Sequence, residues 1–591
     1  MSLFITLTRK RIVLLIVAAT ASTAALYAAF QALAPAPAAL SSFVPQGSLL
    51  SIESPNFAAV LKSWITSSEQ RAWLASDNYA AFSRSRLFGR LGDAQNQFAT
   101  SAGLPPNMHF LQQVAGKQSI FAWYDIGNLQ FLYITRMAAG AAEQTPLLQL
   151  RSKFQLRKSG DDSFYLRTQG DPERTVAFAT HGDYLLLATR EDLLANALLL
   201  MQHSDPSLSS LNNESWYASV ITAGATRSSG QPDLRMALNL TRIVPTPYFR
   251  SYWIQQNITD LKRYSATLSD LYLSKQDFRE ERILLPKAAD NIAPTADLAP
   301  ILQFAPLGTG VYRASAHPTT DQALDALNDK LLASNASSFR DQRFAPVIDL
   351  NVQDVGSIND LETRIDTPPI PQQPVATSLA PLRALFDATP LDALLVYSST
   401  ASTRANEGPA GNLFLPVHTA VVLSSPTPFA PSTIQSALSQ ALSARLTVST
   451  ASLNWQTHQR GSVAYFELAG LEPLAFAIHG NFCILASDPE ALLEILNVFH
   501  PNHPEALIAT AAAGFNHTAE RPGFSRLTSL LDRTDQSAQS SDGPPAFFSR
   551  NVGSLSRTFE SLDSETFTET VLSKPDIAPI VTQKVVYKWR P

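Results

Sequence analysis

The chain repeats itself: short segments in its first half return, in the same order, in its second half. Residues 43–54 match residues 304–315, with a phenylalanine, a proline, a glycine and the final serine in register. Residues 177–188 match residues 475–486 more closely, since AFATHGDYLLLA aligns with AFAIHGNFCILA. Collinear matches of this kind indicate an internal duplication, so the fold should be built from two copies of one unit.

A third pair of matching segments lies near the C-terminal end of each copy. A Leu-Ser dipeptide followed by a Phe-x-Glu triplet occurs at residues 268–269 and 278–280, and again at residues 555–556 and 567–569. Because the three matches keep their order, we expect each copy to run from its first matched segment to beyond its third.

The matches divide the body into two halves. Half A spans residues 44–290 and half B spans residues 305–591, and residues 291–304, with prolines and alanines between Ala293 and Pro300, are predicted to form the linker. A chain of 591 residues is also too long for one compact core.

The pattern inside each half predicts antiparallel strands. Ser119–Tyr124 and Leu129–Thr135 are β-rich runs separated by Asp125–Asn128, whose glycine and asparagine tolerate the positive φ of a hairpin turn. In half B the corresponding runs, 393–397 and 414–423, are separated by a longer Ser/Thr/Gly-rich loop.

A second predicted hairpin leads into a helix. Ala177–Thr180 and Tyr184–Ala188 flank a His-Gly-Asp turn, and Glu191–Met201 follows with acidic residues in its first turn, where they suit the helix dipole. Residues 55–102 are predicted to be mainly helical. The fold class is therefore α+β, with helices packed on antiparallel sheets in each half.

The duplication predicts equivalent packing. Alternating exposure along the hairpin strands should give matched positions one environment, with Leu186 and Ile484 both in a core. The other matched positions are Phe178, Leu185 and Leu187 in half A and Phe476, Cys483 and Leu485 in half B.

Charge and cysteine content exclude some functions. The net charge is -5 and no dense Lys/Arg stripe occurs, which removes the electrostatic footprint of nucleic-acid binding. Cys483 is the only cysteine, so neither an intramolecular disulfide nor a cysteine-cluster metal site can form. Within the apolar run Phe482–Leu485 its thiol should be buried and inert.

The N-terminal region predicts a membrane anchor. Residues 12–34 contain no charge and are rich in Leu, Ile, Val and Ala, and a helix of this length reaches about 30 Å, the thickness of a hydrocarbon core. Arg9, Lys10 and Arg11 precede it, which by the positive-inside rule leaves residues 1–11 as a cytoplasmic tail. A cleaved signal peptide is the alternative, although its apolar run is usually only ~7–15 residues.

Residues 35–43 are predicted to be an extended spacer, because alanine and proline alternate at its start. The body beyond it would then lie outside the membrane. The partners expected on this basis are the membrane itself, through residues 12–34, and an envelope protein or lipid.

Two stretches, residues 44–50 and 474–492, resemble an uncharacterised family of bacterial envelope proteins with an N-terminal membrane helix and a long domain of unknown function. The resemblance implies a single-pass protein of the bacterial inner membrane, with a periplasmic α+β body. It supplies no activity and no site residues.

Paired His-Gly motifs are the first candidate site. His181-Gly182-Asp183 and His479-Gly480-Asn481 occupy equivalent positions, but glycine with Asp or Asn is what a tight turn requires, so we favour turns.

A second candidate is a metal site in residues 500–505, where His500, His503 and Glu505 are close together. Pro501 and Pro504 prevent the helical H-E-x-x-H arrangement, so these histidines are interpreted as surface residues.

The remaining candidates have plainer explanations. Gly116-Lys117 lacks the upstream glycine of a phosphate loop and is interpreted as a strand-entry turn. Three arginines, Arg84, Arg86 and Arg90, could meet anionic headgroups but fit a solvated helix face. Trp64 and Trp73 could line a ligand pocket, although core packing is favoured. The sequence thus identifies no catalytic, cofactor-binding or metal-ligating residues.

Three functions compete. The first is non-enzymatic binding or scaffolding of another envelope component, suggested by the anchor and the duplication. The second is a carrier or sensor of an apolar ligand such as a lipid, because sheets covered by helices can enclose a cavity. The third is an enzyme whose site is assembled from distant segments. We expect a membrane-tethered, extracytoplasmic protein with a non-enzymatic binding or scaffolding role, and the other two functions stay as alternatives.

Overall fold

A computed structural model describes residues 38–590 in several stretches, and its folded body is α+β. The following residues lie outside the description: 1–37, 171–172, 204–206, 226–229, 247–260, 289–291, 307, 333–378, 401–405, 408–412, 415–416, 447–452, 470–472, 499–504, 537–559, 575–576 and 591. The predicted tail and anchor, residues 1–34, therefore lie outside it. In the described part of the chain, no helix is both long and apolar enough to cross a membrane.

Among the described residues, twenty strands form one antiparallel sheet, and each half contributes ten of them. In half A, hydrogen-bonded neighbours follow one another from the outer edge inward. Their order is β4 (Gln155–Ser159), β5 (Asp162–Gln169), β6 (Arg174–His181), β7 (Tyr184–Ala188), β3 (Gln130–Arg136), β2 (Ser119–Asp125), β1 (Leu50–Ser54), β8 (Leu234–Leu238), β9 (Tyr264–Leu273) and β10 (Asp277–Pro286).

Half B repeats this order strand for strand. Its sequence of neighbours is β17 (Trp455–Arg460), β18 (Val463–Leu468), β19 (Leu474–His479), β20 (Phe482–Ala486), β16 (His418–Ser424), β13 (Ala393–Ser399), β12 (Val311–Ala316), β22 (Ala511–Asn516), β23 (Leu562–Lys574) and β24 (Ile577–Trp589). The duplication predicted from sequence is therefore present as two copies of one strand order.

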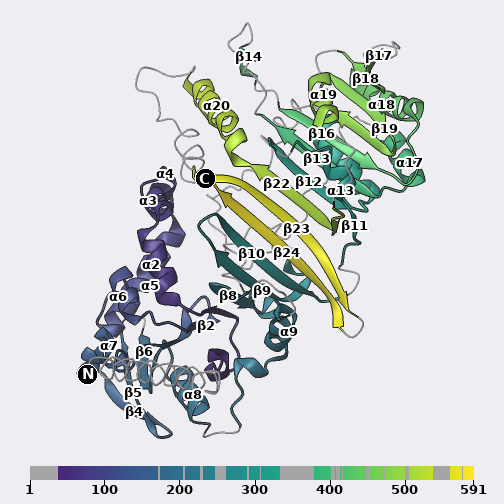
Figure 1. Cartoon of the computed structure of the whole chain (residues 1–591). Helices are drawn as coiled ribbons and strands as arrows, with labels where there is room; N and C mark the ends of the chain where they lie inside the picture. Colours follow the sequence, from purple (N-terminus) through teal and green to yellow (C-terminus); the bar gives the residue numbers. More distant parts are fainter. Residues whose placement is uncertain are drawn as a thin grey trace, which may run out of the picture.

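The last strand of one half pairs with the last strand of the other. Strands β10 and β24 are antiparallel, from Asp277 opposite Lys588 to Leu284 opposite Val581, with Glu281 opposite Lys584 near the middle. Figure 1 shows the β23–β24 hairpin in yellow beside β9 and β10, between the two halves. The junction has the symmetry of a two-fold dimer interface within a single chain.

Helices cover both faces of each half-sheet. In half A these are α2 (Phe57–Thr66), α3 (Ser68–Leu74), α4 (Asp77–Phe82), α5 (Arg86–Ala102), α6 (Met108–Val114), α7 (Pro146–Gln149), α8 (Glu191–Gln202), α9 (Ser215–Gly224) and α10 (Leu240–Ile243). In half B they are α13 (Ala299–Leu302), α14 (Thr320–Leu327), α17 (Ala380–Ala388), α18 (Pro431–Leu446), α19 (Pro489–Val498) and α20 (His517–Gln536). The helical prediction for residues 55–102 is confirmed by α2 to α5.

Both predicted hairpins are present, and their registers agree between the halves. Ala177 lies opposite Ala188 and His181 opposite Tyr184, just as Ala475 lies opposite Ala486 and His479 opposite Phe482. Strands β2 and β3 pair as the predicted antiparallel hairpin, and β13 pairs with β16 in half B.

The expected equivalence of packing is also confirmed, but the expected alternation of exposure is wrong. Phe178, Leu185 and Leu187 belong to the core under α5, α6 and α7, and their counterparts belong to the core under α17 and α18. Leu186 and Ile484 lie in the cores on the opposite faces, against α8 and α19 respectively. Because helices cover both faces, residues 185–188 and 483–486 are buried throughout.

The third sequence match aligns two strands that are not equivalent in the two halves. Phe278 lies on β10, whereas Phe567 lies on β23, which pairs with β22 as β9 pairs with β8. By this topology β23 corresponds to β9 and β24 to β10. Residues 555–556 lie outside the description. Both strands of a hairpin alternate apolar and polar residues, so a Phe-x-Glu triplet cannot tell one from the other.

The predicted spacer and linker were given too many residues, because the C-terminal part of each belongs to the core of the half that follows it. Residues Leu40–Phe43 form a short 3-10 helix in the core of half A, and Leu298, Ile301 and Phe304 are buried in half B. Short strand β11 (Ala296–Asp297) also pairs with β21 (Ile508–Ala509) of half B. Each of the segments 40–43 and 298–304 packs a phenylalanine ring against the hairpin of its own half.

These ring contacts are equivalent in the two halves. Phe43 packs against Tyr184 with ring centroids 5.9 Å apart, and Phe304 packs against Phe482 with centroids 4.8 Å apart. Each half therefore begins with a buried phenylalanine that covers its own hairpin.

Truncating Leu186 or Ile484 to alanine should destabilise the protein by about 2–5 kcal/mol, because each removes a fully buried side chain from a close-packed core. Chemical denaturation followed by circular dichroism measures the change. Leu156→Ala is the control, since Leu156 is 59% exposed and its truncation should change stability little. A stable I484A variant beside an unstable L186A variant would contradict the equivalence of the halves.

Candidate functional site

The paired His-Gly motifs form turns, as predicted. Gly182 and Gly480 have φ of 55° and 58°, the left-handed conformation that favours glycine. His181 Nδ1 lies 2.7 Å from Asp162 Oδ2, whereas the ring of His479 packs at 6.4 Å from that of Phe304. The two histidines serve separate halves and do not share a site.

Gly116-Lys117 is the predicted strand-entry turn. A Cβ on Gly116 would lie 2.3 Å from the carbonyl oxygen of Arg136, so only glycine fits against this backbone. The amide of Gly116 donates to Thr135 Oγ1 at 3.0 Å.

The tryptophan prediction is half wrong. Trp73 is partly buried against Tyr79, with ring centroids 6.2 Å apart, but Trp64 is 46% exposed because α2 presents this face to solvent. Arg90 is exposed on α5, in agreement with a solvated helix face, whereas Arg84 is exposed in the turn between α4 and α5. The side chain of Arg86 lies outside the description.

His500 and His503 fall outside the described residues, so their interpretation stays a prediction. Elsewhere in the part of the chain that the structure describes, no group of three or more His, Cys, Asp or Glu side chains could hold a metal ion.

A cavity in half A lies between the sheet and helices α5 and α6. Its volume is about 480 Å³, within the ~300–1,000 Å³ typical of small-molecule sites. Nineteen residues line it: Ile52, Ser54, Phe57, Leu91, Ala94, Gln95, Phe98, Pro106, Phe110, Leu111, Val114, Ser119, Phe121, Trp123, Leu129, Phe131, Tyr133, Leu187 and Leu234. None of these carries a charge. We call this cavity the apolar pocket.

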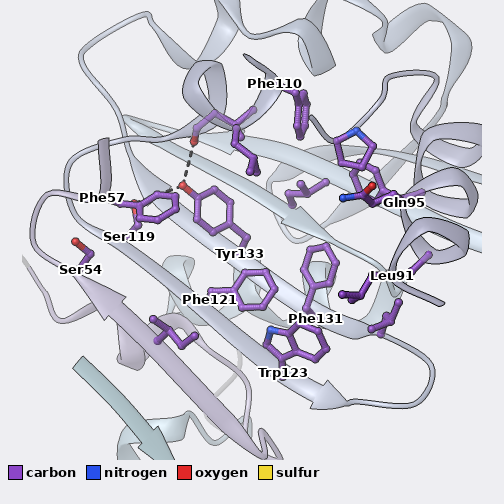
Figure 2. A pocket seen from close by; sticks show the side chains of 18 of the residues that line it. Ser54, Phe57, Leu91, Gln95, Phe110, Ser119, Phe121, Trp123, Phe131 and Tyr133 are labelled. Atoms are coloured by element: carbon purple, nitrogen blue, oxygen red, sulfur yellow. Dashed lines mark hydrogen bonds between the residues drawn. The ribbon is translucent and has the colours of Figure 1, made fainter. Parts of the chain in front are cut away.

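Strands β2 and β3 supply the aromatic floor of the apolar pocket. Phe121 and Trp123 alternate along β2, and Phe131 and Tyr133 along β3, so all four side chains point to one face. The rings of Phe121 and Phe131 stack with centroids 4.9 Å apart. Figure 2 shows these rings gathered on the sheet, with Phe110 beyond them.

Helix α5 forms the opposite wall. Ser85 caps its N-terminus by accepting from the amide of Phe88, and Gly103 ends it with φ of 73°. Leu91, Gln95 and Phe98 follow one another at helical spacing along the side that faces the pocket. Leu91 and Gln95 are exposed, which places them at the rim.

Three of the polar groups that line the apolar pocket are engaged within the protein. Tyr133 donates to the carbonyl oxygen of Val114 at 3.0 Å, as Figure 2 shows, and Ser54 donates to that of Asp233 at 2.9 Å. Ser119 Oγ lies 2.6 Å from Thr135 Oγ1. The interior therefore offers mainly apolar contact.

Half B does not repeat this lining. By strand register, Trp123 corresponds to Ser398 and Phe131 to Thr419. The same face of half B is instead packed by α17 and α18 around Val421, Leu423 and Leu485. The aromatic floor is thus an addition to the shared fold.

The sequence carried a signal for this pocket that the sequence interpretation missed. The predicted hairpin at residues 119–135 places aromatic residues at alternate positions on both strands, whereas residues 396–398 and 419–421 of half B read Val-Tyr-Ser and Thr-Ala-Val. A comparison of the two halves position by position would have identified it.

No family model matches the chain, and no curated protein sequence is significantly similar to it. Among solved structures, it is similar to one described as crystal form III of TP0453, with 9% sequence identity and a TM-score of 0.18, over 49% of this chain and 91% of that one. A TM-score this low does not establish a common fold.

Cys483 should not react with a thiol reagent such as Ellman's reagent in the native protein, because it is fully buried and burial raises the pKa of its thiol. Unfolding in guanidinium should release one equivalent of reactive thiol. Rapid labelling of the folded chain would show that this part of half B opens readily.

Proposed function

We propose that this protein is a membrane-anchored, extracytoplasmic carrier or sensor that binds an apolar ligand in half A. The observation that carries the proposal is the apolar pocket, a cavity of about 480 Å³ with no charged side chain in its lining. Of the functions considered from sequence, this is the one for which the fold provides a specific feature.

The aromatic floor supports binding rather than packing alone. Phe121, Trp123 and Phe131 are only partly buried although they line a cavity inside the protein. A ligand in the cavity would add dispersion contacts to these rings. Removal of apolar surface from water would add about 25 cal/mol per Å². A hydrocarbon chain or ring system satisfies both requirements.

The location is part of the same proposal. Residues 12–34 would hold the body at the membrane surface, with residues 1–11 in the cytoplasm and the two halves in the bacterial periplasm. A tethered body with an apolar pocket could take its ligand from the adjacent bilayer.

The ligand prediction concerns the double variant Trp123→Ser with Phe131→Thr, which gives the pocket the residues of half B. Loss of two ring contacts of about 1.5–3 kcal/mol each should weaken binding roughly a hundredfold or more. The full-length chain is purified in a mild non-ionic detergent, and bound compounds are extracted and identified by mass spectrometry. The wild-type chain should carry an apolar compound that the double variant lacks.

Trp64→Ser is the matched control, because Trp64 is an exposed tryptophan outside the pocket. It should retain the compound at the wild-type level. Equal amounts of every extracted compound in all three proteins would refute binding in the pocket.

The topology prediction is that a periplasmic reporter fused after Pro591 is active, whereas a reporter that functions only in the cytoplasm is not. Protease added to spheroplasts should digest the body. Deletion of residues 1–37 should release the protein from the membrane fraction, since the deletion removes the uncharged run. A protected body would contradict the orientation.

A further inference from the structure

A row of charged residues crosses the sheet of half A on the face opposite the apolar pocket. Glu53 on β1 lies opposite Arg235 on β8, and Arg235 lies opposite Asp270 on β9. Arg235 donates to both carboxylate oxygens of Asp270, at 2.7 and 2.9 Å. Tyr217 of α9 donates to Glu53 Oε1. We call these four residues the charged row.

The fold does not require the charged row, because half B builds the same sheet without it. In identical register, Ala314 on β12 lies opposite Ala512 on β22, which lies opposite Thr568 on β23. Both alanines are buried. Buried ion pairs are weak contributors to stability, since desolvation offsets their attraction. A charged row present in only one of two equivalent sheets therefore points to a role other than folding.

A second cavity opens onto the charged row. Its volume is about 370 Å³, and it is lined by Leu40, Glu53, Ser54, Pro55, Gln118, Ser119, Gln231, Pro232 and Arg235. We call it the polar pocket. Glutamine amides, a carboxyl group and a guanidinium together offer both hydrogen-bond donors and acceptors.

The polar pocket adjoins the apolar pocket. Ser54 and Ser119 line both cavities, and they are the paired residues with which the β1–β2 ladder ends. Pro55 lines the polar pocket, and Phe57, two residues on, lines the apolar one. One cavity lies on each face of the sheet, and the two share lining residues at this strand end.

The charges of the row determine which polar groups of a ligand could bind in the polar pocket. Its two carboxyl groups outnumber its one guanidinium, and Nε and Nη2 of that guanidinium already donate to Asp270. Burial raises the pKa of the Glu53 carboxyl group above its ordinary value, against the lowering effect of the hydrogen bond from Tyr217, so a donor that bonds to the ionised carboxylate would offset part of the cost of burying its charge. With Glu53 ionised, the row carries more negative than positive charge, so it would repel an incoming anion, whereas a hydroxyl or ammonium group could donate a hydrogen bond to Glu53.

We propose that the polar pocket binds the hydroxyl- or amine-bearing head of the same ligand whose tail occupies the apolar pocket. This inference rests on the proposed function and makes the ligand an amphiphile with a neutral or cationic head. The fold would thus hold tail and head on opposite faces of one sheet.

Three probes of one chain length test the head preference: an alkylamine, a monoacylglycerol and a fatty acid. Their dissociation constants are measured with the full-length chain by equilibrium dialysis, in a fixed concentration of non-ionic detergent. The amine and the glycerol ester should each bind about tenfold more tightly than the fatty acid, the ratio expected for one hydrogen bond to a charged group.

The half-B-like variant replaces the three charged residues of the row by the residues at the equivalent positions of half B. It combines Glu53→Ala, Arg235→Ala and Asp270→Thr with Tyr217→Phe, which avoids leaving the tyrosine hydroxyl without its acceptor. We expect it to bind the three probes with equal affinity. Glu280→Gln is the control, because Glu280 pairs with Arg282 outside both pockets, and it should keep the wild-type order.

A second variant guards against a loss of folding. Glu53→Gln retains an oxygen for the Tyr217 hydrogen bond and removes only the ionisable group, so it should weaken the amine more than the glycerol ester. A circular dichroism melt confirms that each variant is folded before binding is measured.

The outcomes separate the two proposals. If all three probes bind the wild-type chain equally, or if the half-B-like variant keeps the wild-type order, the polar subsite is refuted and the apolar pocket stands. If no probe binds the wild-type chain, both proposals fail.

Discussion

The antiparallel ladder between β10 and β24 is the interaction on which the architecture depends. Without it each half would end in an open edge strand, with a row of unpaired backbone amides and carbonyls that invites association with other chains. Here the edge of one half is completed by the equivalent edge of the other, and Glu281 lies opposite Lys584 near the centre of the junction. The duplicated chain thus satisfies internally the bonds that two separate copies would have had to make as a dimer.

Because both halves share one fold, each serves as a physical control for the other. Positions that keep their character, such as Phe178 with Phe476 and Leu186 with Ile484, are buried in equivalent cores and are needed for packing. Positions that differ need another explanation. The aromatic floor of the apolar pocket and the charged row both occur in half A alone, and they lie on opposite faces of the same strands.

The repeated hairpin was the most predictable part of the fold. A glycine between two short apolar runs fixes both the turn and the register, so Gly182 and Gly480 identified strands, pairing and the helix that follows. Element boundaries were less predictable. Leu40 and Phe43 belong to the core although the adjoining Ala-Pro repeat predicted a spacer, because burial there depends on Tyr184, which is distant in sequence. Exposure along the strands was also misjudged, since alternation assumes one solvated face and helices cover both.

The sequence by itself determined the duplication, the α+β class and the antiparallel hairpins, because these follow from local patterns of turn residues and apolar spacing. The pairing of β10 with β24 was decided only in three dimensions, since it joins strands separated by most of half B. The same is true of the two pockets. Trp123 and Leu91, or Glu53 and Asp270, become neighbours only when the sheet forms and α5 and α9 pack on its faces. Local sequence specifies elements, but a cavity is a property of the space between them.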